Sequence, residues 1–131
     1  MLIAAFIILS FAVLLGSTFA VLHLRAQSGT AVSWPVPWPV AALHGFLGIG
    51  GLVCLVLALR GPPMGPERGL DQGTASFGMI AATLFALAAL AGGGILAAHL
   101  RKRRRAGTLI GLHAALAVSG FVILAAYLLA G

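Results

Sequence analysis

The sequence predicts an all-α fold, a bundle of four transmembrane helices, and three observations support this prediction. Hydrophobic residues make up 61% of the 131 residues and charged residues only 8%, against about 25% charged residues in soluble domains. Four apolar runs are each roughly 20 residues long, which is the length that a helix needs to cross the hydrocarbon core. No run alternates in the manner of a barrel strand, so helices are the expected spanning form.

The four runs predict a single integral membrane domain, residues 1–131, with short connections. We expect helices over about 2–22, 40–59, 77–98 and 108–130, and none of these runs contains Asp, Glu, Lys or Arg. The first run lacks a basic start and is longer than the apolar region of a signal peptide, so we expect it to be retained as a helix. Near the end of the last run, Tyr127 is typical of an anchor at the membrane interface.

The basic residues predict the orientation of the chain in the membrane. Arg25 and the basic run 101–105 place six cationic residues on one face, whereas Arg60 and Arg68 place two on the other. The positive-inside rule then puts the first and third connections in the cytoplasm and both termini outside, in the cell (inner) membrane of a bacterium. Because these residues flank apolar runs and form no broad patch, we expect the lipid bilayer, and no nucleic acid, as the partner of the charge.

The second and fourth runs resemble each other, which indicates a duplicated two-helix hairpin. Residues 43–53 align without gaps on residues 112–122, with Leu, His, Leu, Gly and Val identical. The first and third runs both end in His-Leu-Arg, at 23–25 and 99–101, and each has a glycine seven residues before its histidine. Two successive hairpins have the same orientation, so we expect them to be related by rotation about an axis along the membrane normal.

Four histidines, one from each predicted helix, are the main candidates for a functional site. Because successive helices alternate in direction, all four histidines fall on the cytoplasmic side. His44 and His113 lie deepest, roughly 7–12 Å beyond their loops. His23 and His99 are each two residues from an arginine and lie near the headgroups. Ionisable residues at membrane depth are costly and usually functional, which directs attention to the deep pair.

Small residues follow both deep histidines. Four and seven residues beyond His44 are Gly48 and Gly51, and the same positions beyond the other deep histidine are Ala117 and Gly120. Such a stripe serves close helix packing. It also leaves room for a flat macrocycle with an imidazole above and below its iron. The repeated occurrence of a histidine beside this stripe favours the cofactor.

With these features the sequence resembles the small four-helix membrane b-type cytochromes, broadly cytochrome b561 and its bacterial relatives. The resemblance covers all four helices, as architecture and as placement of histidines. It implies that His44 and His113 ligate one haem b and that the protein carries electrons rather than acting as an enzyme by itself. Two axial histidines favour electron transfer over oxygen activation. The implied partners are membrane or periplasmic redox proteins, with quinone a further candidate. Unlike dihaem members, this chain has no histidine near the other face.

Several alternatives stay open at this point. His23 and His99 ligate a second haem or lie at the interface without a ligand. Arg25 and Arg101 pair with haem propionates or contact lipid headgroups. A transition-metal site built from the four histidines is the second hypothesis, although the spans offer no carboxylate ligand. The third is an accessory or structural subunit of a larger redox complex that has no cofactor of its own.

Overall fold

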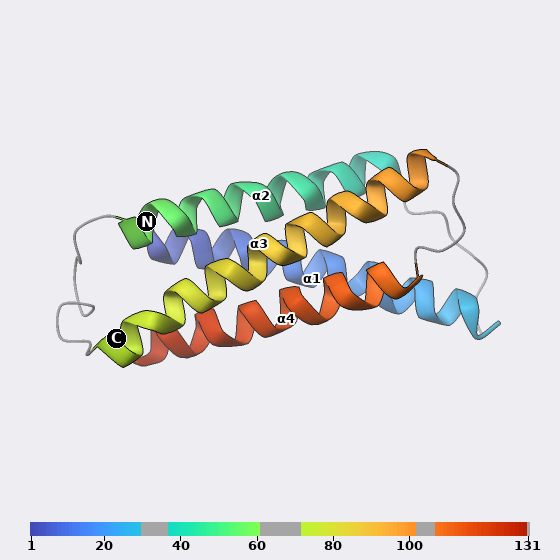
Figure 1. Cartoon of the computed structure of the whole chain (residues 1–131). Helices are drawn as coiled ribbons and strands as arrows, with labels where there is room; N and C mark the ends of the chain where they lie inside the picture. Colours follow the sequence, from blue (N-terminus) through green and yellow to red (C-terminus); the bar gives the residue numbers. More distant parts are fainter. Residues whose placement is uncertain (30–36, 61–71, 102–106, 131) are drawn as a thin grey trace.

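The computed structural model describes residues 1–29, 37–60, 72–101 and 107–130, which form an antiparallel bundle (Figure 1). The four helices of this described part are α1 (Leu2–Gln27), α2 (Trp38–Arg60), α3 (Gln72–Leu100) and α4 (Gly107–Ala130). Each contains a stretch of 23 to 25 residues that is long and apolar enough to cross a membrane. The chain is therefore a multi-pass membrane protein, and the expected four-helix transmembrane bundle is confirmed.

Two helices are longer than their apolar runs. α1 continues through Gln27, and the Ser28 amide still donates to the Leu24 carbonyl at 3.0 Å. α3 begins at Gln72, before the start that we expected at residue 77. Hydropathy marks only the part of a helix inside hydrocarbon, whereas backbone hydrogen bonding continues the helix into the headgroup region. The expected ends at 22 and 77 were therefore wrong by five residues each.

The helices form two hairpins that pack side by side. α1 packs mainly on α2, and α3 packs mainly on α4. Between the hairpins α1 contacts α4 and α2 contacts α3, so that α2 and α4 stand diagonally opposite each other. The start of α1 and the end of α4 lie at one end of the bundle in Figure 1, and the end of α1 and the start of α4 lie at the other.

The core is thin and made largely of small side chains. Leu9, Leu55 and Leu124 are the largest fully buried residues of the described part, and Ala5 and Ala81 are buried among them. A stacked aromatic pair, Phe6 of α1 and Phe121 of α4, joins the two hairpins with ring centroids 5.3 Å apart. Since lipid is as apolar as this core, close packing and not removal from water must hold the helices together.

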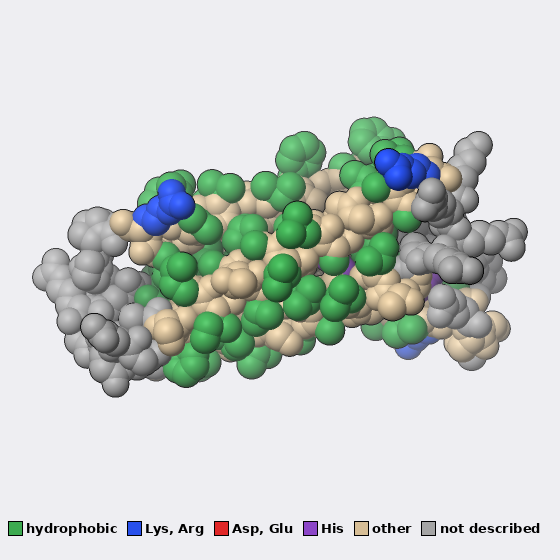
Figure 2. Space-filling model, in the orientation of Figure 1, with side chains coloured by type: hydrophobic (Ala, Val, Ile, Leu, Met, Phe, Trp, Pro, Cys, Tyr) green, Lys and Arg blue, Asp and Glu red, His purple; other side chains and the backbone are tan. Residues whose placement is uncertain are grey.

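The outer surface matches a bilayer environment. In Figure 2 hydrophobic side chains cover the length of the bundle, and the Lys and Arg side chains in view lie at its two ends. Arg25 and Arg101 belong to one end and Arg60 to the other, because all three stand at C-terminal helix ends and α2 runs antiparallel to α1 and α3. Arg68 and residues 102–105, which also entered the charge count, lie outside the described residues.

Tyr127 does not occupy the interfacial position expected for it. Its side chain is only 5% exposed and belongs to the core cluster. The ring lies over Gly78 of α3, where an added Cβ would be 3.2 Å from Cε1. The expectation of a lipid-facing anchor was wrong because the glycine on α3 leaves space that the ring fills.

Candidate functional site

His44 points from α2 toward the neighbouring α1. It lies six residues after Trp38, the first residue of α2, and hence about 9 Å along the helix. Its Nδ1 donates to the carbonyl oxygen of Ala12 at 3.0 Å. A carbonyl can only accept, so Nδ1 carries a proton, and in the neutral ring Nε2 keeps a lone pair. The neutral imidazole therefore presents one nitrogen able to bind a metal.

The His44 ring packs against the backbone of α1 at Gly16. A Cβ added at Gly16 would lie 2.7 Å from Cε1 of His44, closer than real Cβ contacts allow. Gly16 is also four residues beyond Ala12, the residue whose carbonyl accepts the histidine proton. A helical side chain covers the turn before its own Cα, so a side chain at this position would shield that carbonyl.

The second hairpin repeats the same arrangement. Nδ1 of His113, six residues into α4, donates to the carbonyl of Ala88 on α3 at 2.7 Å. A Cβ added at Gly92, four residues beyond Ala88, would lie 3.2 Å from Cε1 of His113. In the neutral form of His113 the lone pair is therefore also on Nε2. These matched contacts are what a duplicated hairpin predicts.

The two histidines meet across the bundle. Their ring centroids are 5.8 Å apart, with the ring planes at 81°. Each is half-buried, and each comes from one of the two diagonally opposite helices. Phe19 of α1 adds a third ring, placed edge-on to His44 at a centroid distance of 5.8 Å. The result is a pair of imidazoles at one level of the bundle, each hydrogen-bonded through Nδ1 to a backbone carbonyl of the neighbouring helix.

The small residues beyond the histidines have different surroundings. Gly51 packs on α1, where an added Cβ would lie 2.7 Å from Cγ of Leu9. Gly120 packs on α3 in the equivalent way, 3.2 Å from Cβ of Leu84. These two glycines serve close helix contact.

At Gly48 an added Cβ would meet no described atom within 4 Å. Gly48 is half-buried one turn beyond His44, so this position adjoins open space.

Ala117, the residue equivalent to Gly48 in the second hairpin, is half-buried one turn beyond His113. Its methyl group makes the two halves unequal at this level. The small residues beyond the histidines therefore differ in role. Gly51 and Gly120 allow close helix packing, whereas Gly48 and Ala117 lie beside the histidine rings.

The structure does not bring His23 and His99 to the deep pair. They lie seven residues beyond Gly16 and Gly92, and hence about 10 Å further along α1 and α3. His23 is half-buried, and His99 is exposed. Arg25 and Arg101 are exposed at the same end of the bundle. These four residues form a separate level near the membrane surface.

Sequence reasoning missed the residues that hold the imidazoles. The glycines seven residues before His23 and His99 were visible as a repeat, but they contact the histidines of the adjacent helices. The sequence does not indicate that the backbone carbonyls of Ala12 and Ala88 accept hydrogen bonds from the histidines. It also does not indicate the contact of the Phe19 ring with His44. A useful signal is an Ala-x-x-x-Gly segment in each of α1 and α3, which ends at the contacting glycine.

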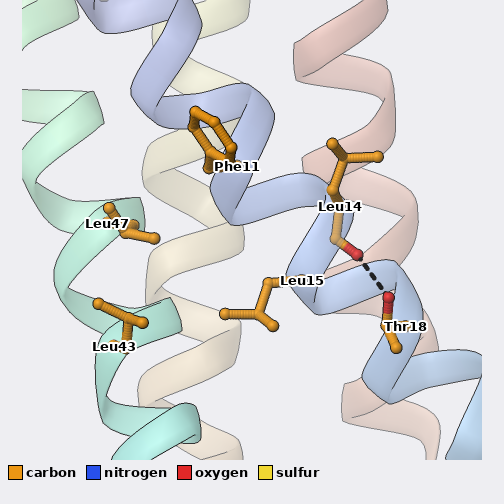
Figure 3. A pocket seen from close by; sticks show the side chains of 6 residues that line it. All are labelled: Phe11, Leu14, Leu15, Thr18, Leu43 and Leu47. Atoms are coloured by element: carbon orange, nitrogen blue, oxygen red, sulfur yellow. Dashed lines mark hydrogen bonds between the residues drawn. The ribbon is translucent and has the colours of Figure 1, made fainter.

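A shallow groove elsewhere on the bundle is a different feature. It runs between α1 and α2 on the outer face (Figure 3), lined by Phe11, Leu14, Leu15, Thr18, Leu43 and Leu47. The one polar side chain in this lining is Thr18, whose hydroxyl donates to the Leu14 carbonyl at 2.9 Å. The groove is part of the apolar surface that faces lipid.

Comparisons with known proteins found no match, so the histidine pair is the main evidence on function. No protein-family model matches the chain, and no curated protein or solved structure is significantly similar to it. Within the described residues, no three His, Cys, Asp or Glu side chains come together as a metal-binding group.

Proposed function

We propose that the chain is a membrane-embedded b-type cytochrome in which His44 and His113 are the axial ligands of one haem b. The observation that carries the proposal is the state of the two rings: each Nδ1–H is bonded to a backbone carbonyl, which leaves the Nε2 lone pair for a metal. Histidines that bind metals are usually oriented by this kind of second hydrogen bond.

The donor set suits a haem better than a bare ion. Haem iron already has four ring nitrogens and needs only two axial ligands, which two imidazoles supply. A bare zinc ion needs three or four protein ligands, and no group of that size forms among the described residues. The ring centroids of His44 and His113 are 5.8 Å apart, so the two imidazoles are near enough to each other to hold one shared group.

Haem would supply reversible one-electron chemistry, and the chain's own residues would hold and orient it. His44 and His113 would be its two protein ligands, which would leave no site for oxygen on the iron and would favour electron transfer. The space beside Gly48 would take part of the macrocycle. Arg25 and Arg101, at the same end as the histidines, are the candidate partners for propionates. Membrane or periplasmic redox proteins, or a quinone, would exchange electrons with this site.

The proposal includes an orientation in a bacterial cell membrane. Six cationic residues flank the end that holds the histidine pair, and two flank the end that holds the termini. The positive-inside rule places the histidine end toward the cytoplasm and the termini outside. The haem would then lie nearer the cytoplasmic face.

An absorption spectrum of the purified, dithionite-reduced protein tests the function. We expect the sharp alpha band of a low-spin b-type haem, lost in His44→Ala and in His113→Ala although both variants still insert. His99→Ala, which removes an exposed histidine, is the matched control and should keep the band. A folded wild-type protein that takes up no haem would contradict the proposal and favour the accessory-subunit alternative. Full haem binding by both deep-pair variants would contradict the ligand assignment.

A further inference from the structure

The geometry points to Gly16 and Gly92 as positioning residues that fix which ring nitrogen each deep histidine offers to a metal. The inference rests on the proposed function, because the nitrogen so offered is the one that would bind haem iron. Neither glycine would touch the haem iron; each acts through the histidine of the neighbouring helix.

The first part of the argument is space. His44 lies so close to α1 that a Cβ at Gly16 would be 2.7 Å from its Cε1 and 3.4 Å from both ring nitrogens. The Cε1 atom of the ring, between the two nitrogens, therefore lies nearest to the bare backbone of Gly16. A methyl group here would push the whole ring away from α1, since its three nearest atoms would all belong to the rigid imidazole and none to a flexible chain end.

The second part is access to the carbonyl. The Ala12 carbonyl already accepts the amide of Gly16 within α1, as helix geometry requires. Its second lone pair accepts the proton on Nδ1 of His44. A side chain four residues beyond a carbonyl lies over that turn of the helix. Glycine at this position leaves the carbonyl open from the side, so that the histidine proton is held on Nδ1 and the lone pair stays on Nε2.

The third part is repetition with a measurable difference. Gly92 and Ala88 do for His113 what Gly16 and Ala12 do for His44. At Gly92, however, an added Cβ would be 3.2 Å from Cε1, a distance that a shift of a few tenths of an ångström relieves. The same substitution must therefore have a large effect in the first hairpin and a smaller one in the second.

The test is nitrogen NMR of the full-length protein in detergent, without haem, with ¹⁵N-labelled histidine. We expect His44 and His113 of the wild type to be protonated on Nδ1, with signals assigned by single His→Ala variants. Gly16→Ala should abolish the Nδ1–H state of His44 and leave that of His113. Gly92→Ala should weaken the Nδ1–H state of His113 only. Haem affinity should fall roughly 10- to 100-fold in Gly16→Ala, as when an orienting hydrogen bond to a metal ligand is removed.

Two neighbouring glycines provide matched controls. Gly45 adjoins His44 and Gly93 adjoins Gly92, and an added Cβ at either meets no described atom within 4 Å. Gly45→Ala and Gly93→Ala should keep both Nδ1–H signals and full haem binding. If Gly16→Ala does not assemble, Gly92→Ala, which needs only a small shift, decides the question.

The outcomes separate the inference from the function. Unchanged ring protonation and unchanged haem affinity in Gly16→Ala and Gly92→Ala would overturn the inference while the cytochrome remains. A wild-type protein that binds no haem overturns the proposed function and, with it, the role of the glycines toward a metal. Effects of equal size in the control variants would also overturn the inference, because they would reflect helix packing in general.

Discussion

Two adjacent glycines in α2 differ in what a side chain would meet. A Cβ at Gly51 would lie 2.7 Å from Cγ and 2.8 Å from Cδ2 of Leu9, a residue that is 1% exposed. A Cβ at Gly50 would meet no described atom within 4 Å. The first glycine is required by close approach of two helices, and the second is only a neighbour in the sequence. Substituting each glycine by alanine therefore distinguishes the effect of helix packing on stability from the effect of helix propensity.

We expect Gly51→Ala to lower the free energy of unfolding by about 1–3 kcal/mol, the usual cost of overpacking. Gly50→Ala should leave it unchanged or raise it by up to about 1 kcal/mol, because alanine is the better helix former. Unfolding in mixed detergent micelles, followed by circular dichroism, measures both. Equal effects of the two substitutions would contradict the contact between Gly51 and Leu9.

At the scale of helices, the histidine hydrogen bonds are repeated in both hairpins, whereas the aromatic stack in the described part lies between α1 and α4 alone. The hydrogen bonds from His44 and His113 each tie the two helices of one hairpin. Between the hairpins, the stacked rings of Phe6 and Phe121 join α1 to α4, with planes at 11°. This stack is a specific link between the halves in a bundle where lipid offers no hydrophobic driving force.

A double-mutant cycle measures this link. For Phe6→Leu and Phe121→Leu we expect a coupling free energy of about 0.5–1.5 kcal/mol, which is typical of an aromatic pair. The control cycle pairs Phe6→Leu with Phe46→Leu, since Phe46 is 78% exposed on the lipid face. That cycle should be additive within about 0.5 kcal/mol. Additivity in both cycles would mean that the stack does not join the hairpins.

At the scale of the whole molecule, the charge distribution and the position of the histidine pair are linked. Arg25 and Arg101 stand at the end from which α2 and α4 start, and both deep histidines lie six residues beyond those starts. If the positive-inside rule holds, the site lies in the cytoplasmic half of the membrane. The termini and Arg60 then face the outside.

Accessibility to a membrane-impermeant maleimide in intact cells checks this orientation. In a Cys54→Ala background, Arg60→Cys should be labelled from outside, because Arg60 is exposed at the end of α2. Ser28→Cys, exposed just beyond α1, should be labelled only after the cells are permeabilised. The reverse pattern would invert the topology and move the proposed haem to the outer half.

Much of this architecture was predictable because it depends on properties counted along one helix at a time. Length and hydropathy predicted the four spans, which are confirmed. The place of each histidine along its helix predicted that His44 and His113 share a level, and their rings are in contact. The ligand role of these residues stays a prediction. The helix ends beyond the hydrocarbon were less predictable, because hydropathy does not report on backbone hydrogen bonding.

Only the tertiary structure decided which residues face one another across helices. It placed Gly16 and Gly92 beneath the histidines, gave Gly51 and Gly120 a packing role, and buried Tyr127. In a soluble protein an apolar stripe on one side of a helix indicates the buried face. These four helices are apolar on all sides, so the sequence carries little information about their rotation. In lipid, the rotation of each helix is set by the shape of its surface. A glycine leaves space for an imidazole ring or a leucine of the neighbouring helix, and the helices rotate so that this space is filled.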